Sequence, residues 1–172
     1  MAEFRDRSGF FMEATVAFNE TNAKGVTKEV SEKYVVEAAS FMDAEQRIRD
    51  EFNWANKPLK TVKNMIRPKY GEICFNNDSA AENFYKVKVQ ITEEVEVRTR
   101  KGGTRTKQKV VSHFYLVQAA SNAEARQAIV DVVYKDSKED YDIADVVKTR
   151  ILDVLEHDKH MQKTAAERGT EE

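Results

Sequence analysis

The segment Tyr34-Val-Val-Glu-Ala-Ala-Ser40 returns as Tyr115-Leu-Val-Gln-Ala-Ala-Ser121, at an offset of 81 residues. The same offset continues without a gap as far as Ile73 and its counterpart Val154. Two copies of one supersecondary unit specify an architecture better than any single motif does, so this repeat decides the fold. We place the first repeat at residues 10–75 and the second at residues 84–155.

Both repeats show the same order of predicted elements. Alternating apolar residues predict an opening strand in each, at residues 12–18 and 85–91. Gly25 in the first repeat and Gly102-Gly103 in the second predict a hairpin turn, and the return strand ends at the shared Tyr-x-Val-x-Ala sequence. A helix and a third strand follow, the strand at residues 62–66 and 143–151. Each repeat is therefore predicted as strand–strand–helix–strand.

The helix starts are marked by a capping box in each copy. Ser40 is followed three residues later by Asp43, and Ser121 is followed at the same spacing by Glu124. In this pattern the hydroxyl accepts a hydrogen bond from an early helical amide and the carboxylate accepts one from the cap. We therefore expect both helices to begin directly after these serines.

The repeats together predict an α+β fold in one domain spanning residues 1–172. We expect a mainly antiparallel sheet, or two abutting sheets, with two helices packed on one face and a projecting β-hairpin. Apolar residues also occur on the second strand face, at Phe11, Val35, Phe114 and Leu116. Either oligomerisation buries this second face or these residues are partly exposed in the ordinary way. Residues 156–172 are expected to form a polar C-terminal tail.

Composition limits the classes of function. The chain has 172 residues with a net charge of −2 and 41% hydrophobic residues, which argues against global disorder and against a strongly basic coat. Cys74 is the single cysteine, so a reducing compartment is favoured. No apolar run approaches the roughly 20 residues that span a bilayer. We expect a cytoplasmic protein without a membrane partner.

Catalytic and metal-binding motifs are missing from the sequence. It holds no nucleophile elbow, no phosphate-binding loop and no zinc-protease motif. His157 and His160 are spaced one helical turn apart, as in half of a metal site, but no further ligand follows, and a surface tail is the preferred interpretation. We predict no enzyme activity, no catalytic residue, no cofactor and no metal.

The longer hairpin is the first candidate binding site. Between residues 98 and 109 the chain has six basic residues and no acidic one. They are Arg98, Arg100, Lys101, Arg105, Lys107 and Lys109. A basic ribbon of this kind can follow a phosphate backbone, with the glycines letting its tip approach closely. The alternative is a solvated hairpin whose like charges prevent edge-to-edge pairing.

The second candidate comes from the repeat itself. Arg67 corresponds to Lys148, and Lys69 corresponds to Arg150, so both repeats carry a basic pair in one register. Such paired cations can face a two-ended anionic ligand, either a nucleic-acid strand or a small anionic nucleotide. A merely charged strand face is the alternative. Aromatic residues Phe84, Tyr85, Phe114 and Tyr115 are a further candidate, as a stacking platform for bases, although aromatic residues in strands more often belong to the core.

The repeat sequence also resembles a known family. The segments Phe84-Tyr-Lys-Val-Lys-Val89, Tyr115-Leu-Val-Gln-Ala119 and Ala123-Glu-Ala125, with a closing strand from residue 141 through residue 154, resemble a domain-of-unknown-function family of Bacteroidetes and of their phages and mobile elements. The resemblance implies a phage or mobile-element setting and carries over no catalytic residue.

Three hypotheses for function follow from the sequence. The leading one is a non-enzymatic accessory protein that associates with nucleic acid through the basic ribbon. The second is sequestration of a small anionic nucleotide at a repeat or oligomer interface. The third is a structural or protein-interaction module, and each is compatible with a homo-oligomer.

Overall fold

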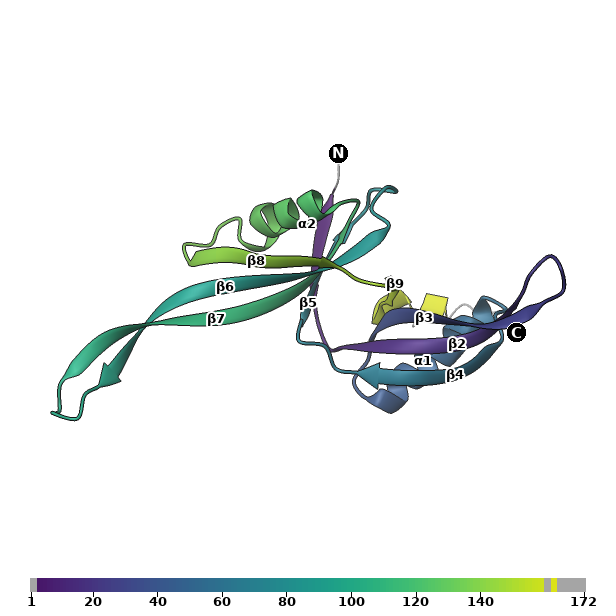
Figure 1. The fold of residues 1–172 in the computed structure, drawn as a ribbon, viewed down its shortest axis with the longest axis horizontal. Helices are drawn as coiled ribbons and strands as arrows, with labels where there is room; N and C mark the ends of the chain where they lie inside the picture. The colour runs from purple at the N-terminus through teal and green to yellow at the C-terminus, as the bar shows by residue number, and fades with distance from the viewer. Residues whose placement is uncertain (1–2, 160–161, 164–172) are drawn as a thin grey trace. The chain divides into compact units, whose positions relative to one another are not determined.

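The computed structural model describes residues 3–159, 162 and 163. The chain is an α+β protein with two mostly antiparallel sheets (Figure 1). It divides into two compact units. One, the α1 unit, holds residues 9–71 and the described residues from 150 onward, and the other, the α2 unit, holds residues 3–8 and 72–149.

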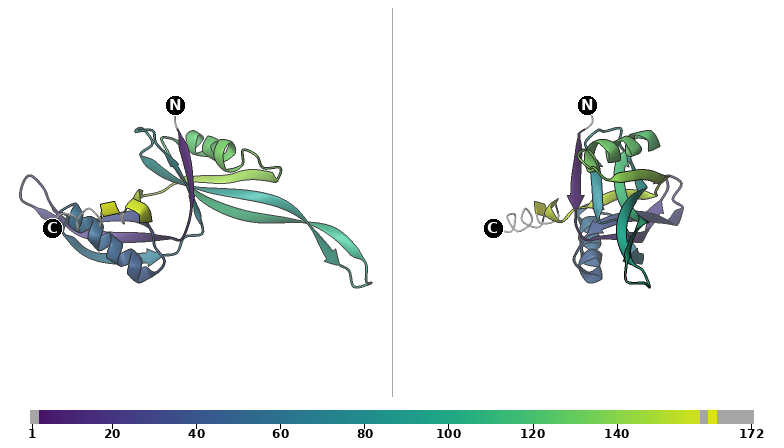
Figure 2. Two further views of the ribbon diagram at one scale, coloured as in Figure 1. Left: turned by 180° about the vertical axis from the view of Figure 1, so that it is seen from behind. Right: turned by 90° about the vertical axis from the view of Figure 1, so that its left-hand side faces the viewer.

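The α1 unit has a four-stranded sheet in the order β4-β2-β3-β9. Strands β2 (Phe11–Thr21) and β3 (Thr27–Glu37) form an antiparallel hairpin, and β4 (Leu59–Ile66) pairs antiparallel with β2. Strand β9 (Ile151–Leu155) is parallel to β3. Helix α1 (Phe41–Trp54) lies along one face of this sheet (Figure 2).

The α2 unit has a five-stranded sheet in the order β1-β5-β7-β6-β8. The long strands β6 (Asn83–Arg98) and β7 (Thr104–Ala119) are antiparallel, and β8 (Asp140–Lys148) pairs antiparallel with β6. Strand β5 (Glu72–Asn76) is parallel to β7, and β1 (Phe4–Ser8) completes the edge. Helix α2 (Asn122–Ala128) continues into a π-helical turn, η1 (Ile129–Val133).

Both helices begin where the capping boxes predict. Ser40 Oγ accepts from the Asp43 amide at 3.1 Å, and Ser121 Oγ accepts from the Glu124 amide at the same distance. The carboxylates of Asp43 and Glu124 accept in return from the amide one residue before each serine. The alternating apolar residues then face each helix, so each unit has its own hydrophobic core.

The third strand of the second repeat differs from the prediction of one strand over residues 143–151. Strand β8 ends at Lys148, and β9 begins at Ile151 in the sheet of the α1 unit. Directly after β8, the amide and the hydroxyl of Thr149 both donate to the carbonyl of Phe84, at 2.9 and 2.8 Å. Strands β1, β5 and β9 were not predicted as separate elements.

Of the two arrangements that the sequence left open, the structure has two sheets. The second strand face is buried at Phe11, Val35 and Leu116, which are 3%, 0% and 0% exposed within a single chain, whereas Phe114 is partly exposed. Their burial therefore requires no oligomer.

Candidate nucleic-acid interface

The β6–β7 hairpin is the longest regular element of the protein. Its two strands pair without a bulge from Asn83 opposite Ala119 to Arg98 opposite Thr104. At the tip, Thr99 donates its amide to the carbonyl of Gly103 at 2.7 Å, and Gly102 has a φ of +83°. That backbone conformation disfavours any residue with a Cβ, so the glycine allows the tight turn.

The outer part of this hairpin has no neighbouring strand. Strand β8 accompanies β6 only as far as Thr92, which pairs with Asp140. Residues 93–109, which we call the arm, therefore pair only with one another and extend beyond the rest of the sheet (Figure 1). An isolated two-stranded ribbon gains little stability from burial, so its sequence is free to serve another role.

The pairing register separates the charges of the arm into two faces. Residues directly opposite each other share a face, and alternate residues point to opposite faces. One face carries three basic side chains, one acid and two valines: Arg105, Lys107, Lys109, Glu93, Val95 and Val97. The other face carries two acids and one basic residue: Glu94, Glu96 and Arg98. We call the first of these the basic face.

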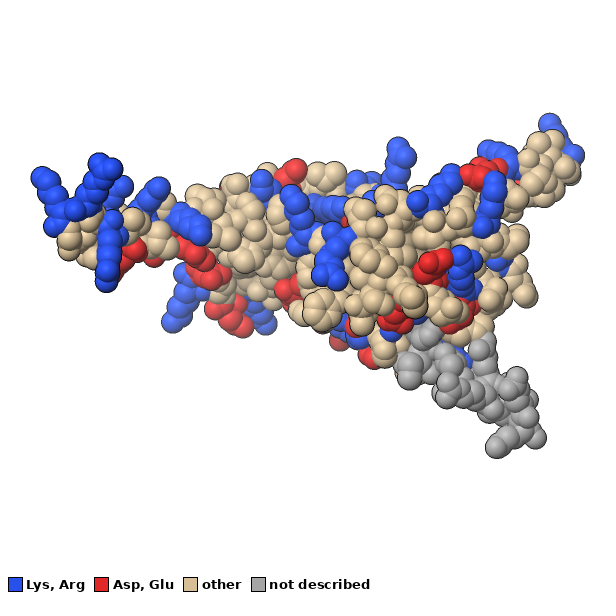
Figure 3. Space-filling view, turned by 90° about the horizontal axis from the view of Figure 1, so that it is seen from below, with Lys and Arg blue, Asp and Glu red and all other residues tan. Residues whose placement is uncertain are grey.

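The tip adds positive charge with no acid. Arg100 and Lys101 lie in the turn, between Arg98 and Arg105 at the ends of the two strands. In Figure 3, Lys and Arg side chains crowd the end of the arm, while Asp and Glu side chains lie nearer the sheet. All six basic residues predicted as a site are exposed, and within the described ranges none of them forms an ion pair.

The sequence prediction left out the acidic residues of the arm. It counted only the residues from Arg98 to Lys109 and so overlooked Glu93, Glu94 and Glu96 on the partner strand. Their alternation with valine was a signal that could have been used, because period-two spacing assigns Glu94 and Glu96 to one face. The arm is thus cationic at its tip and on one face, rather than all round.

The repeat-paired cations are placed differently from one another. Arg67 and Lys69 lie in the segment after β4, and Arg150 lies just before β9, so all three belong to the α1 unit. Lys148 is instead the last residue of β8, opposite Tyr85 in the α2 unit. Equal register in the sequence therefore does not give these four residues equal surroundings.

Arg150 lines a cavity on the surface of the α1 unit. The cavity has a volume of ≈ 460 Å³ and is also lined by Thr15, Ser31, Glu32, Lys33 and Leu152. Lys33 forms an ion pair with the buried carboxylate of Glu13 at 2.8 Å, and that carboxylate also accepts from the Tyr70 hydroxyl at 2.9 Å. Two hydroxyls and the guanidinium of Arg150 are thus the groups in this cavity best suited to an anion.

Two other lysines of the first repeat are neutralised. Lys60 and Lys63 each lie 2.5 Å from a carboxylate oxygen of Glu29, and hydrogen bonds first from Lys60 and then from Lys63 lower the pKa of Glu29 to about 2. Both lysines occupy irregular positions where the register between β4 and β2 shifts. Bulges and lysines of this kind protect an edge strand from pairing with another chain.

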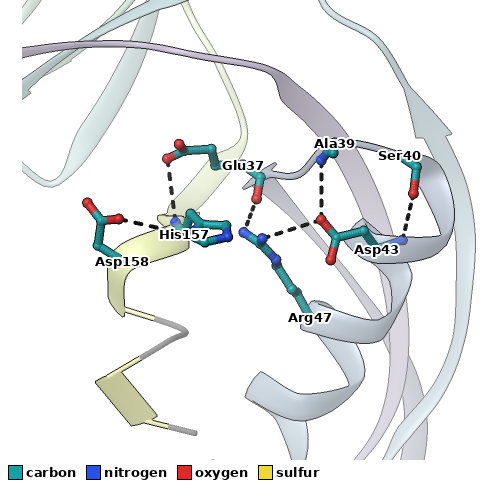
Figure 4. Close-up of polar contacts among 7 residues, drawn as sticks. All are labelled: Glu37, Ala39, Ser40, Asp43, Arg47, His157 and Asp158. Carbon is teal, nitrogen blue, oxygen red and sulfur yellow. Dashed lines mark hydrogen bonds and ion pairs between the residues drawn. The ribbon is translucent and has the colours of Figure 1, made fainter. Parts of the chain in front are cut away.

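A polar cluster around Arg47 joins the start of α1 to the residues after β9 (Figure 4). Arg47 is 5% exposed, donates from Nη1 to the carbonyl of Glu37, and lies 3.3 Å from Asp43 Oδ2 through Nη2. The amide of His157 donates to Glu37 Oε2 at 3.4 Å. This cluster fixes the helix start against the strand, which is a structural role. His157 contributes its amide to the cluster, and His160 lies outside the described residues.

Two buried titratable groups, Cys74 and Tyr70, are held in their protonated forms. Burial, followed by the charge of Asp6 and a hydrogen bond with it, raises the pKa of the Cys74 thiol to about 12. Burial and the adjacent Glu13 carboxylate likewise raise the pKa of Tyr70. Neither group is an activated nucleophile at neutral pH. Within the described residues there is no cluster of three His, Cys, Asp or Glu side chains that would hold a metal ion.

The aromatic candidates belong mainly to the core. Phe84 and Tyr85 are 2% and 6% exposed, and the hydroxyls of Tyr115 and Tyr134 lie 2.8 Å apart. Phe84 and Tyr85 therefore do not offer their ring faces to bases, whereas Phe114 and Tyr115 are partly exposed.

Fold and surface together define a duplicated α+β protein that carries a cationic hairpin arm. Residues 10–157 match the family described as Domain of unknown function (DUF4494), so the chain belongs to that family. No curated protein and no solved structure matches the chain. Across the described residues, no helix has the length and apolar character needed to cross a membrane.

Proposed function

We propose that the protein is a non-enzymatic accessory protein that binds nucleic acid through the arm. The observation that carries the proposal is the basic face, where Arg105, Lys107 and Lys109 follow one another at alternate positions of one strand. Alternate residues of a strand are about 6.7 Å apart, so each cation can contact a separate phosphate. Arg100 and Lys101 extend the positive charge around the tip.

Contacts of this kind do not read bases. The arm offers cations and short polar side chains, and phosphate contacts position a protein without reporting the sequence. We therefore expect binding to mixed-sequence DNA or RNA with a strong dependence on salt. Each phosphate contact contributes a slope of about −0.9 for duplex DNA, or about −0.7 for single strands, in log K against log salt.

Fluorescence anisotropy with labelled single-stranded and duplex DNA and RNA over a salt series tests the proposal. Changing Arg105, Lys107 and Lys109 together to Gln should weaken binding at low salt and reduce the salt slope by about two to three contacts. The matched control changes Lys24, Lys28 and Lys138 to Gln, which removes the same charge from exposed positions outside the arm. The proposal fails if wild-type protein does not bind at low salt, or if both variants lose affinity equally.

A second candidate is capture of a small anionic nucleotide in the cavity lined by Arg150. Because β9 lies in the α1 unit, this cavity has Thr15 and Ser31 from the first repeat and Arg150 from the second. Titration calorimetry against a panel of cyclic and linear nucleotides should then give a signal that Arg150→Gln removes and Lys24→Gln retains. If no nucleotide in the panel gives a binding signal, this candidate is rejected.

The setting of the protein belongs to the same proposal. The family resemblance supports a phage or mobile-element origin, and the single buried cysteine supports a cytoplasmic location. Neighbouring genes of the phage or mobile-element type, and recovery of the protein in the cytosolic fraction, are the expected results. A structural or protein-interaction module is expected to form a homo-oligomer. Light scattering on purified protein measures whether it does.

A further inference from the structure

The last strand of each repeat lies in the sheet of the other repeat. Strand β5 follows the first repeat's ββαβ unit, but it pairs with β7 of the second repeat. Strand β9 follows the second repeat's ββαβ unit, but it pairs with β3 of the first. The order β4-β2-β3-β9 therefore matches the first four strands of the order β8-β6-β7-β5-β1, with the strands β9 and β5 exchanged and β1 added beyond β5.

The two exchanged strands, β5 and β9, pair with their host strands at equivalent residues. Ile73 pairs with Leu116, and the 81-residue offset converts this pair into Val154 with Val35, which is also observed. The adjoining pair of Cys74 with Val117 becomes Leu155 with Val36, and this too is observed. Both pairings are parallel. Such agreement in register indicates one acceptor site present twice, and not two unrelated sheet edges.

Each exchanged strand contributes to the core of its host. Cys74 is 1% exposed and belongs to the core cluster of Val87, Val117 and Ile129, all from the second repeat. Leu155 packs against the core cluster of the first repeat, which includes Met12, Ile48 and Phe52. Removing either strand would expose apolar surface in the repeat that receives it.

The connections explain why no repeat can fill its own acceptor edge. Strand β8 runs antiparallel to β6, which runs antiparallel to β7, so β8 is parallel to any strand at the β5 position. A chain that returns to a parallel position in the same sheet needs a crossover of about a dozen residues or more. Only residues 149–150 separate β8 from β9, and only residues 67–71 separate β4 from β5. Both links are too short.

We infer that the edges of β3 and β7 are acceptor sites for one parallel strand that only another repeat can supply. The chain is thus the covalent form of a strand-exchanged pair of repeats. Within one molecule the two repeats supply each other, and when the cis strand is detached, the same segment from a second copy of the chain takes its place. When β9 is detached, the strand that binds the edge of β3 is therefore the equivalent segment of a second copy, with apolar residues at the positions of Val154 and Leu155.

A nicked form of the full chain tests this inference. A short protease recognition sequence is inserted between Thr149 and Arg150, and the folded protein is then cleaved there. The segment from residue 150 onward should stay with the rest of the protein through gel filtration. A fluorescent peptide of residues 150–159 in excess should replace it, seen as a rise in anisotropy. The control peptide carries Val154→Asp and Leu155→Asp and should not bind.

Two results would overturn the inference. One is loss of the cleaved segment while amides of β3 and α1 keep their hydrogen-exchange protection, because the edge would then need no strand. The other is equal binding of both peptides. If the insertion prevents folding, the same protease sequence between the exposed residues Ser79 and Ala80 gives a second test. Cleavage there should leave two fragments that elute together, whereas their separation under native conditions contradicts the exchange.

Discussion

At the scale of single residues, Cys74 gives a direct report on burial. Its thiol is 1% exposed, and burial followed by the influence of Asp6 raises its pKa to about 12. We expect Ellman's reagent to label the native protein at neutral pH only as fast as the structure opens, and to label it at once in denaturant. A Phe10→Cys variant provides the control, since Phe10 is 72% exposed and the new thiol should react immediately. Rapid labelling of native wild-type protein would contradict the burial of β5.

Glu72 makes the stability of the same region depend on pH. Asp6 and Glu72 lie on one face of neighbouring strands, and burial, then hydrogen bonding to and the charge of Asp6, raises the pKa of Glu72 to about 7 from 4.5. A carboxyl with a raised pKa binds its proton more tightly in the folded state, so its contribution to stability falls as pH rises from about 4.5 through about 7. Glu72→Gln should flatten this part of the profile and stabilise the protein above pH 7. Urea unfolding at several pH values measures it, with Glu20→Gln as a control that keeps the wild-type slope.

At the scale of elements, the two capping serines should contribute alike. Each accepts a hydrogen bond from the third amide of its helix at 3.1 Å. Ser40→Ala and Ser121→Ala are each expected to lower the free energy of unfolding by about 1 kcal/mol, because an early helical amide loses its partner. The matching Ser→Asp variants should restore most of the loss. Unequal effects would show that the 81-residue equivalence does not extend to the energetics of the caps.

The arm should be dispensable for folding. Residues 93–109 pair only with each other, so replacing them with a two-residue Asn-Gly turn removes no contact from either core. We expect the free energy of unfolding to change by less than about 0.5 kcal/mol while binding to nucleic acid is lost. Loss of stability with the deletion would assign the arm a structural role, and retained binding would move the binding site elsewhere.

At the scale of the whole molecule, local sequence patterns predicted each repeat but not how the repeats complete each other. Alternation in β2 and β6 and the caps at Ser40 and Ser121 are local signals, and the structure confirms the strands and helices they predict. The pairing of β5 and β9 depends on residues more than 40 positions away, such as Leu116 for Ile73, and no local pattern specifies that choice. Lys148 belongs to a different unit from Arg67, Lys69 and Arg150 for the same reason, because the chain passes from one unit to the other at residue 150.

Local sequence patterns predicted only part of the arm. Its length and its tip follow from period-two alternation around Gly102-Gly103, which is local. The division of its charge between two faces requires the register that places Glu93 opposite Lys109. That register is fixed by the turn geometry, which a count of basic residues does not include.

Reciprocal strand exchange predicts which unit each terminal strand stabilises. The chain offers one native reporter in each, since its only tryptophan, Trp54, ends α1 and its only cysteine, Cys74, lies in β5 of the α2 unit. The most direct measurement follows Trp54 fluorescence and Cys74 labelling through one urea titration. The exchange predicts that Val154→Ala, a change in the second repeat, lowers the midpoint reported by Trp54 in the first repeat, because Val154 pairs with Val35 in the sheet of the α1 unit. A Val154→Ala effect confined to Cys74 labelling, with the Trp54 midpoint unchanged, would contradict it.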